Sequence, residues 1–394
     1  MKHFEDVRHQ EANYLMPTYS RFSAALVSGK GAVAEDTEGK KYIDFGSGIG
    51  VNSLGFCDDG WVAAVSHQAA ALQHISNLYY SPVQTQLAET LCRLTGFDRV
   101  FFCNSGAEAN ECAIKLARKY SVEKYGKGRT NIITLKNSFH GRTVTTLAAT
   151  GQEAFHDYFF PFTEGFSYAE ANNLDDLKEK ADENTCAVFI ELIQGEGGVM
   201  PLDGAYVKAL AAYCKERDIL LLCDEVQTGV GRCGALYCYE RYGIRPDVVT
   251  SAKGLGGGVP IGACLCRRGL GKVLSAGQHG TTFGGNPIAC AAAEYVLSRV
   301  GNKAFLQDVE EKGDYIREKL ARIPGVHSIR GLGLMIGVVL EEGYTARAVA
   351  AKCVENGLLL LTAKELVRLL PPLTITYDEI DKGIAVFEKT MKGE

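Results

Sequence analysis

The sequence predicts a mixed α/β protein with a large unit around a mainly parallel sheet and a smaller α+β unit. First, 394 residues exceed what one ordinary hydrophobic core accommodates, so two packed units are expected. Second, from about Ser81 to Arg299, apolar runs alternate with helical periods, which is typical of parallel strands covered by helices. Third, strand-like segments near both chain ends lack this alternation.

The individual elements follow in chain order. Residues Ala24 to Phe45 predict short strands around turns, which indicates an antiparallel piece. The main strands are predicted at Arg99–Cys103, Asn131–Leu135, Ala187–Leu192, Ile219–Cys223 and Asp247–Ser251. The smaller unit is predicted from a strand at Gly333–Leu340, a helix near Thr345–Glu355, an apolar run at Leu358–Leu361 and a final helix from about Asp378. We expect residues 1–52 and 301–394 to build the smaller domain and residues 53–300 the large one.

Composition narrows the function classes. The net charge is −5, so no basic field attracts nucleic acid or anionic lipid, and no nucleic-acid partner is expected. No stretch reaches the roughly 18 apolar residues that a membrane span needs, and the first ten residues show no targeting pattern. A soluble, cytoplasmic protein is expected.

Thirteen cysteines are scattered through the chain, mostly inside apolar segments, and no CxxC pair occurs. Buried thiols in a reducing compartment are therefore favoured over disulfides or a metal site. No metal ligand set is predicted.

Two charged residues follow the apolar run Ile219–Cys223. Asp224 and Glu225 lie where that strand ends, and ligands bind at the carboxyl ends of strands in open α/β sheets. Exposed loop carboxylates are the alternative.

A lysine follows the next strand in the same way. Lys253 comes directly before a glycine-rich run, Gly254 to Gly258, which removes side chains and lets a planar ligand approach the backbone. The alternative is a solvated or ion-paired surface lysine.

A third element, Asn104 to Ala109, joins a strand to a helix. Free N–H groups at a helix start suit a phosphate, although the same Ser-Gly-Ala-Glu pattern also makes an ordinary capped helix. Together the three elements supply a phosphate cup, an acid for a ring nitrogen and an amine for a Schiff base. This combination predicts pyridoxal 5'-phosphate (PLP), with Asp224 keeping the ring an electron sink and Lys253 acting as covalent anchor and proton carrier.

Competing cofactor motifs are weaker. Gly229 to Gly234 has the letters GxGxxG, but Asp224 to Thr228 separate it from the strand and no helical period follows, so a loop is predicted. Neither the P-loop pattern GxxxxGK[ST] nor the zinc pattern HExxH occurs.

Six blocks in order resemble the class III (ω-amino-acid) aminotransferases of PLP fold type I, over nearly the whole chain. They are SGAEANECAIKLARKY from Ser105, FHGRT from Phe139, IQGEGGV from Ile193, DEVQTGVGRCG from Asp224, PDVVTSAKGLGGGVPIGA from Pro246 and HGTTFGGNP from His279. The resemblance implies a large domain with a seven-stranded, mainly parallel sheet, and a homodimer with shared active sites.

The resemblance also implies roles for matching residues. Lys253 would be the Schiff-base lysine and Asp224 the partner of the ring nitrogen. Further cofactor contacts would come from Ser105, Gly106, Ala107, Phe139, Glu225, Val226, Gln227 and, across the dimer interface, Thr282. By composition alone, Phe139 would be a core residue, and His140 is expected to be a packed hydrogen-bonding residue without a catalytic role.

Substrate contacts are implied for a second set of residues. Arg142 would bind a substrate carboxylate with its planar guanidinium, although a surface ion pair is the alternative on composition. Arg368 is hypothesised to pair with Glu196 until glutamate enters and to bind the α-carboxylate of glutamate then. Thr281 and the N-terminal Tyr19 would lie near the substrate.

The implied reaction is transamination of N2-acetylornithine with 2-oxoglutarate, giving N-acetylglutamate 5-semialdehyde and glutamate, a step of arginine synthesis. Succinylornithine, ornithine and 4-aminobutyrate remain alternative donors. From another class, a PLP-binding protein without turnover is the alternative.

Overall fold

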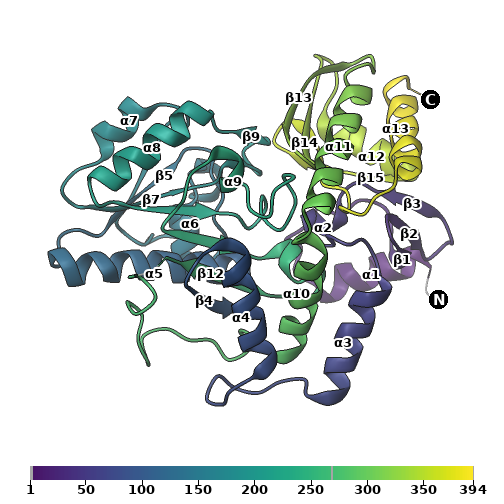
Figure 1. Cartoon of the computed structure of the whole chain (residues 1–394). Coiled ribbons are helices and arrows are strands. Elements are labelled where there is room, and N and C mark those ends of the chain that lie inside the picture. The colour runs from purple at the N-terminus through teal and green to yellow at the C-terminus, as the bar shows by residue number, and fades with distance from the viewer. Residues whose placement is uncertain (1–2, 268, 394) are drawn as a thin grey trace.

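The computed structural model describes residues 3–267 and 269–393, and its largest element is a seven-stranded sheet (Figure 1). The strand order is β4-β12-β11-β10-β7-β5-β6. Its strands are β4 (Arg99–Cys103), β5 (Asn131–Leu135), β6 (Phe166–Ala169), β7 (Thr185–Ile190), β10 (Leu220–Asp224), β11 (Val248–Ser251) and β12 (Gly262–Cys266). Within this sheet β12 pairs antiparallel with both neighbours, whereas the other pairs are parallel. The predicted mainly parallel sheet is confirmed.

Both faces of this sheet are buried, as parallel strands require. Alternate residues of one strand belong to different core clusters: Leu222 packs with Ala113 of α5, whereas Leu221 and Cys223 pack in the larger cluster on the other face. Each fully buried aliphatic side chain contributes about 1.5–3 kcal/mol. The helices of this part are α3 (Asp59–Ala71), α4 (Pro82–Thr95), α5 (Gly106–Tyr125), α6 (Val144–Ala149), α7 (Leu174–Lys180), α8 (Gly204–Glu216), α9 (Tyr239–Tyr242) and α10 (Pro287–Val300).

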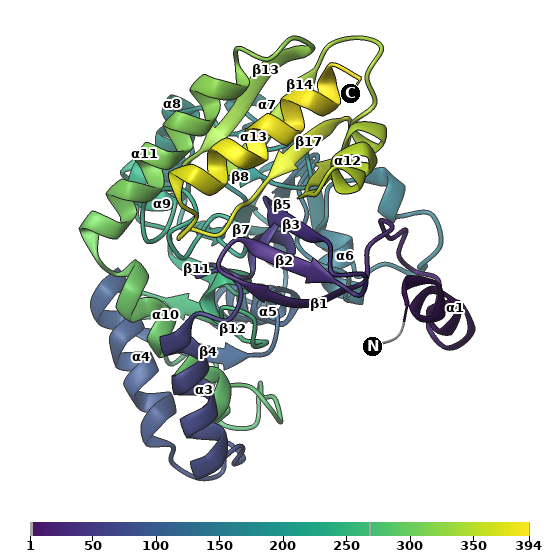
Figure 2. The ribbon, with the colours of Figure 1, turned by 90° about the vertical axis from the view of Figure 1, so that its right-hand side faces the viewer.

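Two four-stranded sheets bring the chain ends together (Figure 2). The first has the order β1-β2-β3-β15, and the second has the order β13-β14-β17-β16. Their strands are β1 (Leu26–Lys30), β2 (Val33–Asp36), β3 (Lys41–Asp44), β13 (Val326–Leu332), β14 (Met335–Leu340), β15 (Leu358–Leu359), β16 (Leu361–Ala363) and β17 (Leu366–Leu369). The antiparallel N-terminal piece is confirmed, and β15 joins it in parallel to β3. The domain boundaries at residues 52 and 300 stay a prediction.

The remaining elements complete the chain. They are α1 (Phe4–Tyr14), α2 (Ser47–Gly50), the short pair β8 (Ile193–Gln194) and β9 (Met200–Pro201), α11 (Lys303–Leu320), α12 (Ala346–Glu355), α13 (Tyr377–Met391) and the 3-10 turns Glu153–Phe155 and Lys253–Leu255. No helix in the described part of the chain is long and apolar enough to cross a membrane.

Some boundaries differ from the predictions. The strand expected from Gly333 begins at Met335, because Gly333 has a φ of +54° and lies in the tight turn between β13 and β14. The run Leu358–Leu361 is not one strand, since its first two residues pair with β3 and Leu361 pairs with β17. Residues 229–234 form the predicted loop.

The cysteines are free thiols, and all of them except Cys57 and Cys92 are buried. This distribution matches the buried thiols that the sequence predicts.

Candidate functional site

A cavity of about 440 Å³ lies at the carboxyl ends of β7, β10 and β11, beside the first turn of α5. Its lining includes ten residues with polar, aromatic or close-packed groups at the cavity: Ser105, Gly106, Ala107, Phe139, Arg142, Glu191, Asp224, Val226, Gln227 and Lys253. Nine of these ten were predicted from the sequence, and Glu191 was not. The structure therefore brings together residues that are far apart in the chain.

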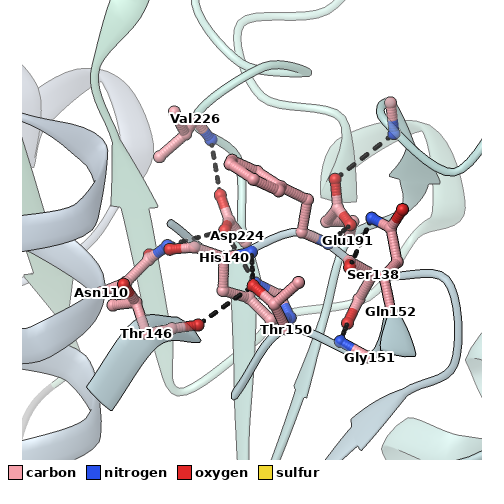
Figure 3. A network of polar contacts seen from close by, with 12 residues as sticks. Asn110, Ser138, His140, Thr146, Thr150, Gly151, Gln152, Glu191, Asp224 and Val226 are labelled. Atoms are coloured by element: carbon pink, nitrogen blue, oxygen red, sulfur yellow. Dashed lines mark hydrogen bonds and ion pairs between the residues drawn. The ribbon is translucent and has the colours of Figure 1, made fainter. Parts of the chain in front are cut away.

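Asp224 is buried and receives three polar contacts (Figure 3). Its Oδ2 accepts a hydrogen bond from Asn110 Nδ2 at 2.8 Å and lies 2.9 Å from His140 Nδ1. Its Oδ1 accepts from the backbone N–H of Val226 at 3.0 Å. These contacts fix the orientation of a side chain that faces the cavity.

Lys253 reaches the same cavity from the neighbouring strand. β10 and β11 are parallel, and Asp224 lies opposite Thr250 in register, so the residues after both strands converge. Lys253 has a φ of +43°, a left-handed conformation that is costly for a residue with a side chain and is common at functional sites. Burial, and then the positive charge of Arg368, lower the pKa of its amine to about 8. A neutral, nucleophilic amine is thus accessible near neutral pH.

The first turn of α5 borders the cavity. Ser105 caps this helix by accepting from the backbone N–H of Glu108 at 3.2 Å. A Cβ on Gly106 would lie 2.7 Å from Val226 Cγ1, so glycine is needed at this close approach. The backbone N–H groups of Gly106 and Ala107 belong to the first turn, where a helix provides no acceptors. Such a turn suits an anionic group.

Arg142 and Phe139 form one wall of the cavity. The guanidinium of Arg142 lies 4.2 Å from the ring centre of Phe155 and 5.6 Å from that of Phe139. Arg142 is exposed and Phe139 is half-buried. A cationic group stacked on aromatic rings is held in place while its N–H donors stay available to a carboxylate.

The predicted pair of Arg368 and Glu196 is present. Arg368 on β17 is buried, and its Nη1 donates to Glu196 Oε1 at 2.6 Å and to Gln227 Oε1 at 3.1 Å. Its Nε is buried without a hydrogen-bond partner. The two residues do not line the cavity themselves, but Gln227 connects them to it.

Besides Arg368 and Glu196, four further predicted residues do not line the cavity. Glu225 points into the core, where its carboxylate accepts from Thr228, Cys238 and Tyr239. Thr281 is half-buried and accepts from Asn104 Nδ2 at 3.0 Å, whereas Thr282 is exposed. Tyr19 is 75% exposed.

Sequence reasoning missed Glu191 and Asn110 and gave no role to His140. Glu191 follows the apolar strand Thr185–Ile190, the same signal that indicated Asp224, so it could have been found. Asn110 lies one turn into α5, and no local pattern marks it. His140 stacks on Phe189 at 4.2 Å between ring centres, as expected for a packed histidine, yet it also contacts Asp224.

Comparisons with known proteins agree on one family. The family model for Aminotransferase class-III matches residues 14–391. The chain is 49% identical over 388 residues to an acetylornithine aminotransferase of Haemophilus ducreyi, covering 98% of each protein. An N-acetylornithine aminotransferase from Stenotrophomonas maltophilia is similar in structure, with a TM-score of 0.85, 34% identity and 98% of each chain covered.

A third relative concerns the cofactor. An ornithine aminotransferase from Toxoplasma gondii, whose structure reveals partial occupancy of PLP at the active site, has a TM-score of 0.95 and 32% identity, with 100% of this chain and 95% of that chain covered. This chain belongs to the class III aminotransferases. It is a transaminase of PLP fold type I, and PLP is its cofactor.

The residues present fit this cofactor. An aromatic ring with a phosphate, a basic nitrogen and a reactive aldehyde needs a phosphate cup, a carboxylate and an amine around one cavity. The first turn of α5, Asp224 and Lys253 supply these groups, and all border the same space. The glycine at position 106 keeps the backbone close to that space.

Proposed function

We propose that this protein transfers an amino group from N2-acetylornithine to 2-oxoglutarate, giving N-acetylglutamate 5-semialdehyde and glutamate in arginine synthesis. The observation that carries the proposal is the pair of guanidinium groups associated with one cavity. Arg142 is available to a carboxylate, whereas Arg368 is neutralised by Glu196. Such a site accepts a substrate with one carboxylate as it stands and a dicarboxylate after the Arg368–Glu196 pair opens. The names of the relatives support the same donor.

Lys253 and Asp224 carry the chemistry in this proposal. Bound PLP supplies an electron sink that stabilises negative charge at the substrate carbon. The Lys253 amine would hold the cofactor covalently and, once released by substrate, move the proton at the reacting carbon. Asp224, oriented by Asn110 and His140, would hold the ring nitrogen in its protonated form.

The other lining residues would position the cofactor. Ser105, Gly106 and Ala107 would bind its phosphate at the start of α5. Phe139 and Val226 would contact the ring, and the Gln227 amide would reach its phenolic oxygen. Glu225 would support this set only indirectly, by anchoring the loop that follows β10.

Substrate recognition would involve the two arginines in different ways. Arg142 would bind the α-carboxylate of the acetylated donor and the side-chain carboxylate of glutamate. Arg368, released from Glu196, would bind the α-carboxylate of glutamate. Thr281 and Tyr19 would border the entrance.

The exposed apolar surface supports a homodimer. Leu78, Tyr79 and Tyr80 are 88%, 71% and 99% exposed, and Phe283, next to Thr282, is 60% exposed. Residues of this kind at such exposure favour burial against a partner. In the proposed dimer, Thr282 of each subunit would bind the cofactor phosphate of the other. We place the dimer in the cytoplasm.

A panel of amino donors tests the proposal. Purified enzyme with PLP and 2-oxoglutarate would be given acetylornithine, succinylornithine, ornithine and 4-aminobutyrate, and glutamate formation would be measured. Acetylornithine should have the highest kcat/KM. Preference for ornithine or 4-aminobutyrate would overturn the donor but keep the aminotransferase, and absence of turnover with every donor would favour a binding protein.

A further inference from the structure

Glu191 is a buried carboxyl group beside Asp224 that the mechanism above does not use. It follows β7, and Ile190 pairs with Cys223 of β10 in register, so Glu191 and Asp224 leave neighbouring strands side by side. Glu191 is 5% exposed and lines the cavity. The structure thus places a second carboxyl group next to the proposed partner of the ring nitrogen.

The side chain of Glu191 connects two backbone segments (Figure 3). Its Oε2 accepts from the backbone N–H of Phe139 at 2.8 Å, and its Oε1 accepts from that of Gly195 at 3.3 Å. The two N–H groups are 56 residues apart in sequence. One carboxyl group therefore fixes the distance between these segments.

Each of the two segments leads directly to an arginine of the substrate site. Phe139 begins the loop that carries Arg142, whose guanidinium lies over its ring. Gly195 precedes Glu196, which holds Arg368. A Cβ on Gly195 would lie 2.5 Å from the amide of Gln227, so the turn at Gly195 packs tightly against this cavity-lining residue.

The buried surroundings of Glu191 favour its neutral form. Burial, and then the neighbouring charge of Asp224, raise the pKa of Glu191 well above the ordinary value for glutamate. A neutral carboxyl group still offers oxygen acceptors to the two N–H groups, so the bridge does not depend on a charge.

We propose that Glu191 is a positioning residue that sets the spacing between the Arg142 loop and the Glu196–Arg368 pair, and so determines affinity for dicarboxylate substrates. This inference rests on the proposed function, in which glutamate and 2-oxoglutarate engage both arginines and the acetylated donor engages Arg142 alone. Spacing between two arginines matters only to a ligand that binds both. Loss of the bridge should therefore weaken dicarboxylates selectively.

The variant E191Q tests the bridge with little change in volume. A carboxamide has one acceptor oxygen, and its NH₂ group can only donate, so it cannot accept from both Phe139 and Gly195 in the observed geometry. The variant E191D keeps the acid but is one methylene shorter and cannot span both N–H groups. Thermal melting would show whether both variants are folded. If E191Q does not fold, the same measurements are made with E191D.

T150V is a matched control that acts on the same loop from the end of α6. Thr150 Oγ1 accepts from the backbone N–H of His140 at 3.0 Å, so valine removes one anchor of the Arg142 loop without touching the Gly195 turn. Both classes of substrate use Arg142 in the proposed function. T150V should therefore change the affinities for both by the same factor.

The direct readout is ligand binding to the holoenzyme, measured by calorimetry with glutarate and with pentanoate, which has five carbons but one carboxylate. E191Q should raise the Kd of glutarate about tenfold, the effect of one lost hydrogen bond, and should leave that of pentanoate within about twofold. In the half-reactions, KM for glutamate should rise more than kcat falls. Equal changes for glutarate and pentanoate, or none, would overturn the inference.

The two proposals fail in different ways. If the wild-type enzyme does not convert acetylornithine, the proposed function fails, while the glutarate and pentanoate affinities still test Glu191. If the wild-type enzyme converts acetylornithine but E191Q and E191D bind glutarate as the wild type does, the role of Glu191 fails alone.

Discussion

Asp224 and Glu225 are adjacent at the carboxyl end of β10, but their side chains lie on opposite sides of the sheet. Asp224 faces the cavity, whereas Glu225 faces the core and accepts from Thr228, Cys238 and Tyr239. The backbone pairing with β11 continues through Glu225, whose N–H donates to Thr250, so the alternation of a strand extends to both residues. A charge at a strand end therefore indicates chemistry on one side of the sheet and loop anchoring on the other.

The largest expected effect concerns the cavity side. Asp224→Ala should lower kcat about 10³-fold, because an oriented charge at the reacting group typically contributes on this scale. The melting temperature should fall as well, because Asn110, His140 and the Val226 N–H lose their partner, so kcat is measured per folded enzyme. Steady-state kinetics with saturating PLP would check this, and a kcat within a few-fold of wild type would contradict the assignment of Asp224.

Glu225, on the core side, should affect stability but not kcat. Glu225→Ala leaves three buried donors without their acceptor, and it should lower the free energy of unfolding by about 2–4 kcal/mol. The kcat per folded enzyme should stay close to wild type. Denaturant unfolding and kinetics at low temperature would measure the two quantities, and an unchanged stability would contradict the structural role.

The pH dependence of stability sharpens the same contrast. Burial raises the pKa of Glu225 from 4.5 to about 7, so the folded state binds its proton more tightly than the unfolded state does. The stabilisation of the folded state by this tighter proton binding is fully present below about pH 4.5 and is lost as the pH rises to about 7. Between these values the stability of wild type should fall relative to that of Glu225→Gln, and parallel curves would contradict this.

A smaller effect is expected at the Arg368–Glu196 pair. Glu196→Ala removes the competitor for Arg368, so KM for glutamate should fall relative to KM for acetylornithine by about tenfold, the scale of one charged hydrogen bond. Single half-reactions followed through the cofactor spectrum would give both values. Equal changes in the two would count against the switch.

The smallest expected effect tests whether the cofactor site needs a residue from a second subunit. Thr282→Ala should weaken PLP binding about fivefold, since one hydrogen bond to phosphate is lost across the proposed interface. Cofactor titration together with sedimentation would measure this. Unchanged affinity in a dimeric protein would show that Thr282 does not reach the partner's cofactor.

Much of this architecture could be predicted because its signals are local. The apolar runs predicted five of the seven strands of the main sheet, all but β6 and β12, and β10 and β11 placed Asp224 and Lys253 at one edge. The split of Leu358–Leu361 between two sheets could not be read locally, since each half pairs with a distant segment. Which side Asp224 and Glu225 face also depends on packing.

In the candidate site, too, contacts between distant segments could not be predicted from local patterns. Lys253, Gly106 and Arg142 were found through motifs, whereas Asn110 contacts Asp224 only because α5 packs beneath β10. Glu191 had a visible signal, but its two partners, Phe139 and Gly195, are brought together only by the fold.

The most direct test of the central claim is borohydride reduction of the PLP-loaded enzyme followed by peptide mapping. The account predicts a yellow protein whose reduced cofactor is attached to the peptide containing Lys253, and a Lys253→Ala variant without this adduct. Attachment at another lysine, or a wild-type protein that stays colourless with added PLP, would contradict it.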